Sequence, residues 1–216
     1  LVSRSINVNV TLIFSNNVYS EVRAAYLAGL ERLISNGGDV SKVSSVASFF
    51  VSRVDTAVDL KLEEIGTFES RQLLSTAAIA NAKQAYRDFL STFSSDRYLK
   101  LQKLGAHPQK PLWASTSTKN PDLSDVLYVD SLIGADIVNT MPDITLSAYK
   151  DHGTPELTLE IGLDQSDMSI NSLKHLDVDL EEITDNLVVE GVRSFQDSFD
   201  KLISEIQVKR SSILIN

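Results

Sequence analysis

The sequence predicts an α/β protein whose strands run parallel and are connected by helices. Two observations carry this prediction: strand-like and helix-like patterns alternate four times, and turn residues separate them. A helix between two strands is the usual crossover of parallel pairing. Four such units form either a small open sheet or part of a closed barrel.

The four predicted strands are short apolar segments, and the first of them shows period-two alternation. Ile6, Val8, Val10, Leu12 and Phe14 are expected on one face of that strand, with the polar residues between them on the other. The strands are predicted over 6–14, 43–54, 112–117 and 136–141.

The helices between the strands have recognisable starts and stops. Ser15 or Asn16 can cap the first helix, and Gly37-Gly38 ends it. The other helices are predicted over 56–66, 71–93, 96–104, 124–133, 143–151 and 179–209, with an irregular stretch before the last one.

Composition excludes several classes of protein. The chain of 216 residues is 43% hydrophobic and has no cysteine, so it has neither disulfides nor a thiol nucleophile, which fits a reducing compartment. Its apolar runs are far shorter than the roughly 20 residues of a membrane span. A formal net charge of −9 argues against binding nucleic acid.

The charge is unevenly distributed. Residues 1–150 contain 15 acidic and 15 basic side chains, whereas residues 151–216 contain 14 acidic and 5 basic ones. We therefore expect one domain over 1–216, with four strand–helix units in 1–142 and an acidic helical tail in 143–216. The last helix has apolar residues at alternating steps of four and three, which fits a coiled-coil seam or a helix packed on its own domain; we expect the second.

Polar residues interrupt two of the predicted strands. Asn9 and Thr11 share a face of the first strand with Asn7, and Ser48 lies in the second. Polar groups on strands of a parallel α/β protein often face a ligand, and hydrogen bonding inside the sheet is the alternative.

Two cations follow the predicted strands. Arg53 and Lys119 lie near the carboxyl ends of the second and third strands, where ligands bind in such folds, and Ser117 and Ser48 can add hydroxyl donors. This set predicts an anion site. Two alternatives remain open: each cation pairs with a local carboxylate such as Asp55, or Lys119 forms a Schiff base with a carbonyl substrate.

The chain carries none of the common nucleotide-binding, hydrolase or metalloprotease motifs. Its three histidines, His107, His152 and His175, lie in predicted loops or helix ends and are expected to be solvated or locally bonded, with no role in catalysis or metal binding. We expect no metal and no cofactor.

Four segments together resemble the transaldolase family, most closely its plant and cyanobacterial-like branch. They occur in the order of the family with compatible spacing, and they are 6–14 (INVNVTLIF), 45–55 (SVASFFVSRVD), 113–120 (WASTSTKN) and 138–142 (VNTMP). The resemblance implies the C-terminal half of a (β/α)8 TIM barrel, strands five to eight, with a helical C-terminal tail.

The resemblance also implies roles for the polar residues. Thr11 would help hold the catalytic water and Asn9 would contact the bound intermediate. Arg53, with Ser48, and Lys119, with Ser117, would bind the substrate phosphate, which makes Lys119 a phosphate ligand and not the nucleophile.

The implied activity is transfer of a dihydroxyacetone unit between sugar phosphates through a lysine Schiff base, in the pentose phosphate pathway. The family's Schiff-base lysine and acid–base carboxylates precede the motif at Ile6, so we expect this chain to lack them and to be inactive alone. The expected partners are sugar phosphates and either the missing N-terminal half barrel or a second copy. The alternative function is a non-catalytic sugar-phosphate-binding or oligomerising half barrel, and the expected location is cytoplasmic, or plastidic in a plant.

Overall fold

A computed structural model describes residues 1–214. Two 3-10 turns, η1 (Val2–Arg4) and η2 (Val40–Lys42), accompany the strands and α-helices. The strands are β1 (Val8–Ile13), β2 (Ser45–Phe50), β3 (Lys110–Ala114) and β4 (Val138–Asn139). The helices are α1 (Asn16–Ser35), α2 (Ser52–Ile65), α3 (Phe68–Arg71), α4 (Ala77–Phe93), α5 (Asp96–Gln102), α6 (Leu127–Ser131), α7 (Asp143–His152), α8 (Leu163–His175) and α9 (Leu180–Leu214).

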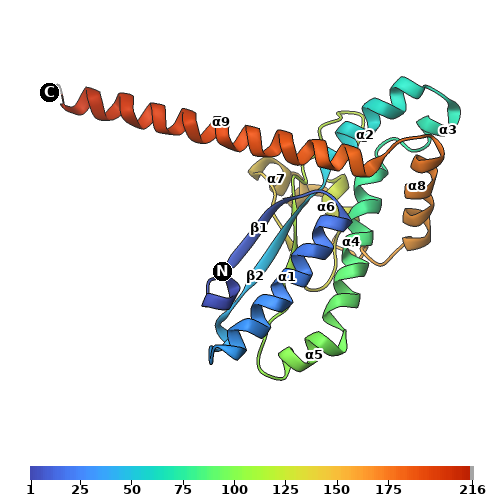
Figure 1. The fold of residues 1–216 in the computed structure, drawn as a ribbon. Helices are drawn as coiled ribbons and strands as arrows, with labels where there is room; N and C mark the ends of the chain where they lie inside the picture. The colour runs from blue at the N-terminus through green and yellow to red at the C-terminus, as the bar shows by residue number, and fades with distance from the viewer. Residues whose placement is uncertain (215–216) are drawn as a thin grey trace.

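The strands form one parallel sheet in the order β1-β2-β3-β4, which confirms the predicted α/β class (Figure 1). Backbone pairing continues beyond the end of β2, because the Val51 and Ser52 amides donate to the Ala114 and Ser115 carbonyls at 2.9 Å each. Within residues 1–214 the outer edges of β1 and β4 pair with no further strand. The sheet is therefore open in the described part of the chain.

The alternation predicted for the first strand stops at Leu12. Leu12 has a φ of 58°, and the pairing shifts between Val10, opposite Ala47, and Ile13, opposite Phe49. This β-bulge places one extra residue in β1. As a result Leu12, Ile13 and Phe14 are all buried in succession, while Asn9 and Thr11 remain exposed.

Helix starts follow the expected capping chemistry, and one of them moves a predicted boundary. The Ser15 hydroxyl accepts a hydrogen bond from the Val18 amide at 3.2 Å, so Ser15 is the N-cap of α1. The second strand was predicted to run to Val54, but it ends at Phe50 and α2 begins at Ser52. Arg53 therefore lies in the first turn of a helix.

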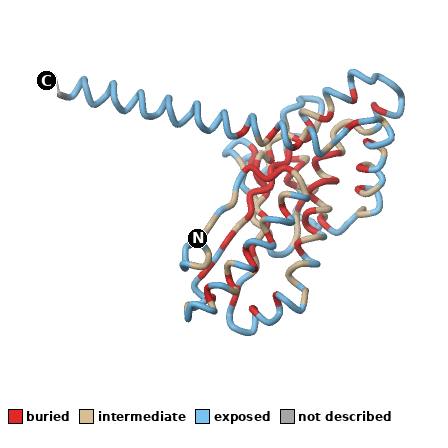
Figure 2. Tube along the Cα trace, viewed as in Figure 1, coloured by how far each residue is buried: buried red, intermediate tan, exposed pale blue. Residues whose placement is uncertain are grey.

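Aromatic and small residues form the main core between the sheet and its helices. Phe49 and Trp113 are fully buried and pack edge to face, with ring centroids 6.0 Å apart. Buried alanines along α4 let that helix approach closely, and they are Ala77, Ala78, Ala80, Ala82 and Ala85. Figure 2 shows the buried residues concentrated around the sheet and α4.

The tail contains α7, α8 and α9. Helix α8 packs against α4, so the stretch predicted to be irregular before the last helix contains a helix (Figure 1). Helix α9 contacts α2 and β1 near its start and then projects away from the body, so the expectation that it packs on its own domain is wrong for its distal part (Figures 1 and 2). Among residues 1–214, every helix falls short of the combined length and apolarity that crossing a bilayer requires.

Candidate functional site

The amino half of β1 and the middle of β2 meet at a polar contact. The Ser48 hydroxyl donates a hydrogen bond of 2.7 Å to Asn9 Oδ1. Ser48 is buried, whereas Asn9 and Thr11 are exposed on the same face of β1. The contact fixes the Asn9 amide with its nitrogen available as a donor. The structure thus brings together two of the residues that the sequence singled out.

Arg53 lies in the first turn of α2, three residues after β2 ends. Its guanidinium lies 5.4 Å from the centre of the Phe50 ring, a cation–π distance, and the residue is half-buried. No carboxylate among residues 1–214 forms an ion pair with Arg53. Its charge is therefore available to an anion.

The nearest carboxylate in sequence, Asp55, has other partners. Asp55 accepts hydrogen bonds from the Ala78 amide at 2.7 Å and from the Tyr128 hydroxyl at 2.9 Å. The alternative in which Asp55 neutralises Arg53 is wrong. Burial raises the pKa of the Asp55 carboxyl to about 6, and the two hydrogen bonds oppose part of that rise.

Ser117 and Lys119 lie beyond β3 in a loop. Strand β3 was predicted to include Ser117 but ends at Ala114, because Ser115 adopts a φ of 57°. Lys119 is exposed and lines a cavity of about 230 Å³ with the carboxylates Asp55, Asp59 and Glu63. Arg53 is not among the residues that line this cavity.

Sequence reasoning missed a hydroxyl pair between β2 and β3. Ser52 Oγ and Ser115 Oγ lie 2.9 Å apart, on the two residues that make the last of the backbone hydrogen bonds given above between these segments. In the sequence, only position pointed to these two serines. Ser52 directly precedes Arg53, and Ser115 directly follows Ala114, in the segments that resemble the family. Spacing along the chain does not show that two serines from different segments meet.

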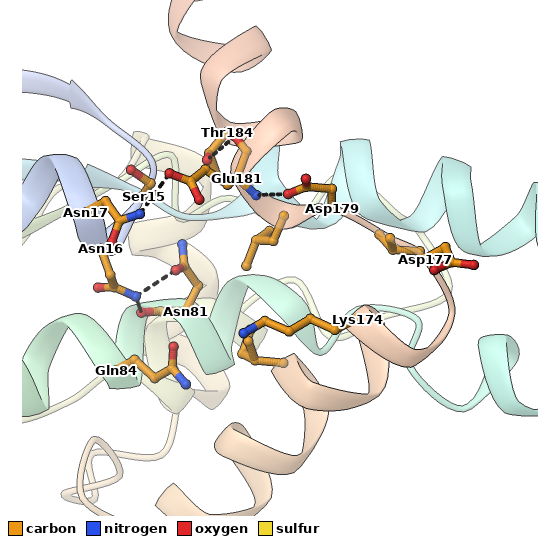
Figure 3. Close-up of a pocket in the computed structure, with 13 residues that line it drawn as sticks. Ser15, Asn16, Asn17, Asn81, Gln84, Lys174, Asp177, Asp179, Glu181 and Thr184 are labelled. Atoms are coloured by element: carbon orange, nitrogen blue, oxygen red, sulfur yellow. Dashed lines mark hydrogen bonds between the residues drawn. The ribbon is translucent and has the colours of Figure 1, made fainter.

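A larger cavity lies elsewhere in the described part of the chain. It has a volume of about 600 Å³ and is bounded by the starts of α1 and α9, by α4 and by the end of α8 (Figure 3). Asn16 Nδ2 donates to Asn81 Oδ1 at 2.9 Å, and Asn17 Nδ2 donates to Glu181 Oε1 at 2.8 Å. None of the six predicted site residues lines it. These hydrogen bonds connect α1 to α4 and α9.

The fold defines a parallel α/β protein with a hydroxyl–amide contact between its first two strands and a guanidinium beyond the carboxyl end of the second, and hydroxyl, amide and guanidinium groups are suited to anionic ligands. The family model described as Transaldolase/Fructose-6-phosphate aldolase matches residues 1–206. The chain belongs to this family.

Three curated relatives are named transaldolase. The protein from Parafrankia sp. (strain EAN1pec) is 47% identical over 211 residues, which cover 97% of this chain and 57% of the relative. The Thiobacillus denitrificans protein is 45% identical, covering 95% and 57%, and the Mycobacterium tuberculosis protein is 44% identical, covering 95% and 56%. The chain spans little more than half the length of these relatives. All three are bacterial, so they do not support the expected plant and cyanobacterial-like branch.

Proposed function

We propose that this chain forms part of a transaldolase, a transferase that moves a dihydroxyacetone unit between sugar phosphates in the pentose phosphate pathway. Family membership and the names of the relatives support the reaction class. The observation that carries the proposal is the guanidinium of Arg53, which forms no ion pair within residues 1–214 and follows the strand that supplies Ser48 to the Ser48–Asn9 contact.

Each predicted residue has a role in this proposal. Asn9 contacts the bound intermediate, Thr11 holds the water that hydrolyses it, and Arg53 and Ser48 bind the phosphate. Ser117 and Lys119 complete the phosphate site from the loop after β3. The Lys119 side chain would turn away from the acidic cavity to reach that site. Its ammonium group offers the phosphate a single point charge, whereas the guanidinium of an arginine could form two parallel hydrogen bonds.

The covalent step in this proposal uses a lysine outside residues 1–216. That amine attacks the ketose carbonyl and loses water to give an iminium ion, which allows the adjacent carbon–carbon bond to break. Lys119 is not the nucleophile, because the proposal assigns it to phosphate. On its own the chain is then inactive.

We further propose that the described sheet is the C-terminal half of a (β/α)8 barrel and is completed by more protein. The unpaired edges of β1 and β4 support this, because long free edges invite pairing with another strand. The missing N-terminal half barrel is the main candidate for that completion, and a second copy of the chain is the other.

The phosphate site can be tested by thermal unfolding of the purified chain with inorganic phosphate or fructose 6-phosphate. We expect both to raise the unfolding temperature, and Arg53→Ala to abolish the rise because it removes the unpaired cation. Arg71→Ala removes an exposed arginine from α3 and serves as the control. An equal rise in the Arg53 variant would refute the assignment.

The nucleophile can be tested in the intact enzyme that contains this sequence. Fructose 6-phosphate and borohydride should label a lysine outside residues 1–216. Label recovered on Lys119 would overturn its role as a phosphate ligand.

A further inference from the structure

The chain that leaves β3 is fastened on one side to the first turn of α2. The Ser52 amide donates to the Ser115 carbonyl at 2.9 Å, and the hydroxyl oxygens of the same two residues also lie 2.9 Å apart. Ser52 is buried, and Ser115 is half-buried with a φ of 57°. Two hydrogen bonds between the same two residues fix their relative orientation as well as their separation.

On the other side the same segment is fastened to the end of β4. Thr116 is fully buried, and its hydroxyl donates to the Thr140 carbonyl at 2.8 Å, while its oxygen lies 3.2 Å from Asn139 Oδ1. The amide and the hydroxyl of Thr140 both donate to the Trp113 carbonyl, at 3.0 and 3.1 Å. Thr140 therefore holds the segment 113–116 at both of its ends.

Each fastened residue directly precedes a residue of the predicted anion site. Ser52 precedes Arg53, and Thr116 precedes Ser117. Because the Cα atoms of chain neighbours are about 3.8 Å apart, a shift of the first residue moves the second. Thr116 is also the last buried residue before the half-buried and exposed stretch 117–125. The position of Thr116 therefore determines where that loop begins.

We propose that the hydroxyl groups of Ser52, Ser115 and Thr116, named here the hydroxyl brace, are positioning groups for the phosphate site. This inference rests on the proposed function, because it concerns the binding of the same substrate phosphate. Arg53 comes from α2 and Ser117 from the loop after β3, so the two can converge on one phosphate only if these elements are fixed relative to each other. The hydroxyl brace supplies that fixation and itself need not touch the phosphate.

Inhibition of the intact enzyme that contains this sequence by inorganic phosphate tests the hydroxyl brace. Thr116→Val keeps the branched shape of the side chain and removes the hydroxyl. We expect it to raise the inhibition constant of phosphate and the KM for fructose 6-phosphate about tenfold. The kcat should change less than about twofold, because the covalent step uses a lysine outside residues 1–216. Thr116→Ser should restore most of the affinity, because it keeps the hydroxyl.

A second variant and a matched control separate positioning from a general loss of stability. Ser52→Ala removes the other side of the hydroxyl brace but keeps the backbone hydrogen bond to Ser115, so it provides the same test if Thr116→Val does not fold. Thr184→Val is the control, because Thr184 is also buried and its hydroxyl donates to the Glu181 carbonyl at 2.9 Å near the start of α9. It should lower the unfolding temperature and leave the inhibition constant unchanged. Circular dichroism would verify that each variant folds.

Three results would overturn the hydroxyl brace. They are an unchanged inhibition constant in Thr116→Val or Ser52→Ala, an equal rise in Thr184→Val, and a failure of Thr116→Ser to restore the affinity. The parent enzyme and Arg53→Ala separate this inference from the proposed function. If phosphate does not inhibit the parent, or inhibits Arg53→Ala equally well, the phosphate site is wrong and the hydroxyl brace fails with it. If Arg53→Ala abolishes inhibition while the brace variants do not weaken it, only the hydroxyl brace is wrong.

Discussion

Asp55 illustrates how burial controls chemistry at the scale of one residue. Its carboxyl lies in the first turn of α2 and accepts hydrogen bonds from Ala78 and Tyr128. Its pKa rises from 3.8 to about 6, with desolvation as the largest cause. As the pH rises, the carboxyl of Asp55 loses its proton at a lower pH in the unfolded chain than in the folded one. The protonated carboxyl therefore stabilises the fold, fully below pH 3.8, relative to neutral pH. This stability is lost as the pH rises through about 6.

We expect Asp55→Asn to remove the loss of folding stability that accompanies ionisation of Asp55 as the pH rises. The asparagine can still accept from the Ala78 amide, and the Tyr128 hydroxyl can accept from its nitrogen. Two pKa units correspond to about 3 kcal/mol, so the difference in unfolding free energy between variant and parent should change by up to that amount from pH 4 to pH 7. Urea unfolding across this range measures it, with Glu69→Gln as an exposed control. A constant difference would contradict the buried, proton-binding Asp55.

At the scale of elements, the beginning of α9 depends on one cap. Asp179 Oδ1 accepts hydrogen bonds from the Glu181 and Glu182 amides at 2.9 and 3.2 Å. The carboxylate satisfies two amides that have no partner within the helix and favourably meets the positive end of the helix dipole. The cap stabilises the segment that links the body to the projecting part of α9.

Asp179→Ala should therefore lower the unfolding free energy by about 1 kcal/mol. Asp179→Asn should recover most of the loss because its side-chain oxygen can still accept. Chemical denaturation measures both. Asp185→Ala, an exposed position in the second turn, is the control for loss of charge. If Asp179→Ala lowered the unfolding free energy no more than this control, the cap would not contribute to stability.

The elements also show which features could be predicted from sequence. The start of α1 was predictable because Ser15 is a strong cap, and the alternation before Leu12 located β1. Helix α8 was missed because serine, asparagine and aspartate along it favour caps and turns over helix interiors. The positive φ of Leu12 has no sequence signal, since that region normally favours glycine or asparagine.

The site was predictable in part for the same reasons. Polar residues on strands identified Asn9 and Ser48, and their hydrogen bond follows from adjacent parallel strands. The early end of β3 and the position of Lys119 beside acidic groups depend on loop conformation. Local sequence does not specify that conformation.

At the scale of the whole molecule, α9 dominates the shape. Its 35 residues span about 50 Å. A compact chain of 216 residues would have a radius of gyration of about 17 Å. Small-angle X-ray scattering of the chain, measured at a concentration where it is monomeric, should give a clearly larger value, because part of the helix lies outside the body. A radius near 17 Å would mean that α9 folds back.

The bulge at Leu12 makes β1 sensitive to deletion in a way that no substitution reproduces. Removing Leu12 would delete the extra residue and leave Ile13 opposite Phe49, so the facing of Asn9 and Thr11 and the start of α1 would be kept. What would be lost is the buried Leu12 side chain, against which Gly191 of α9 lies closely. We therefore expect insertions and deletions among relatives to be rarer at Leu12 than in the loop that holds Lys119. Both segments are short.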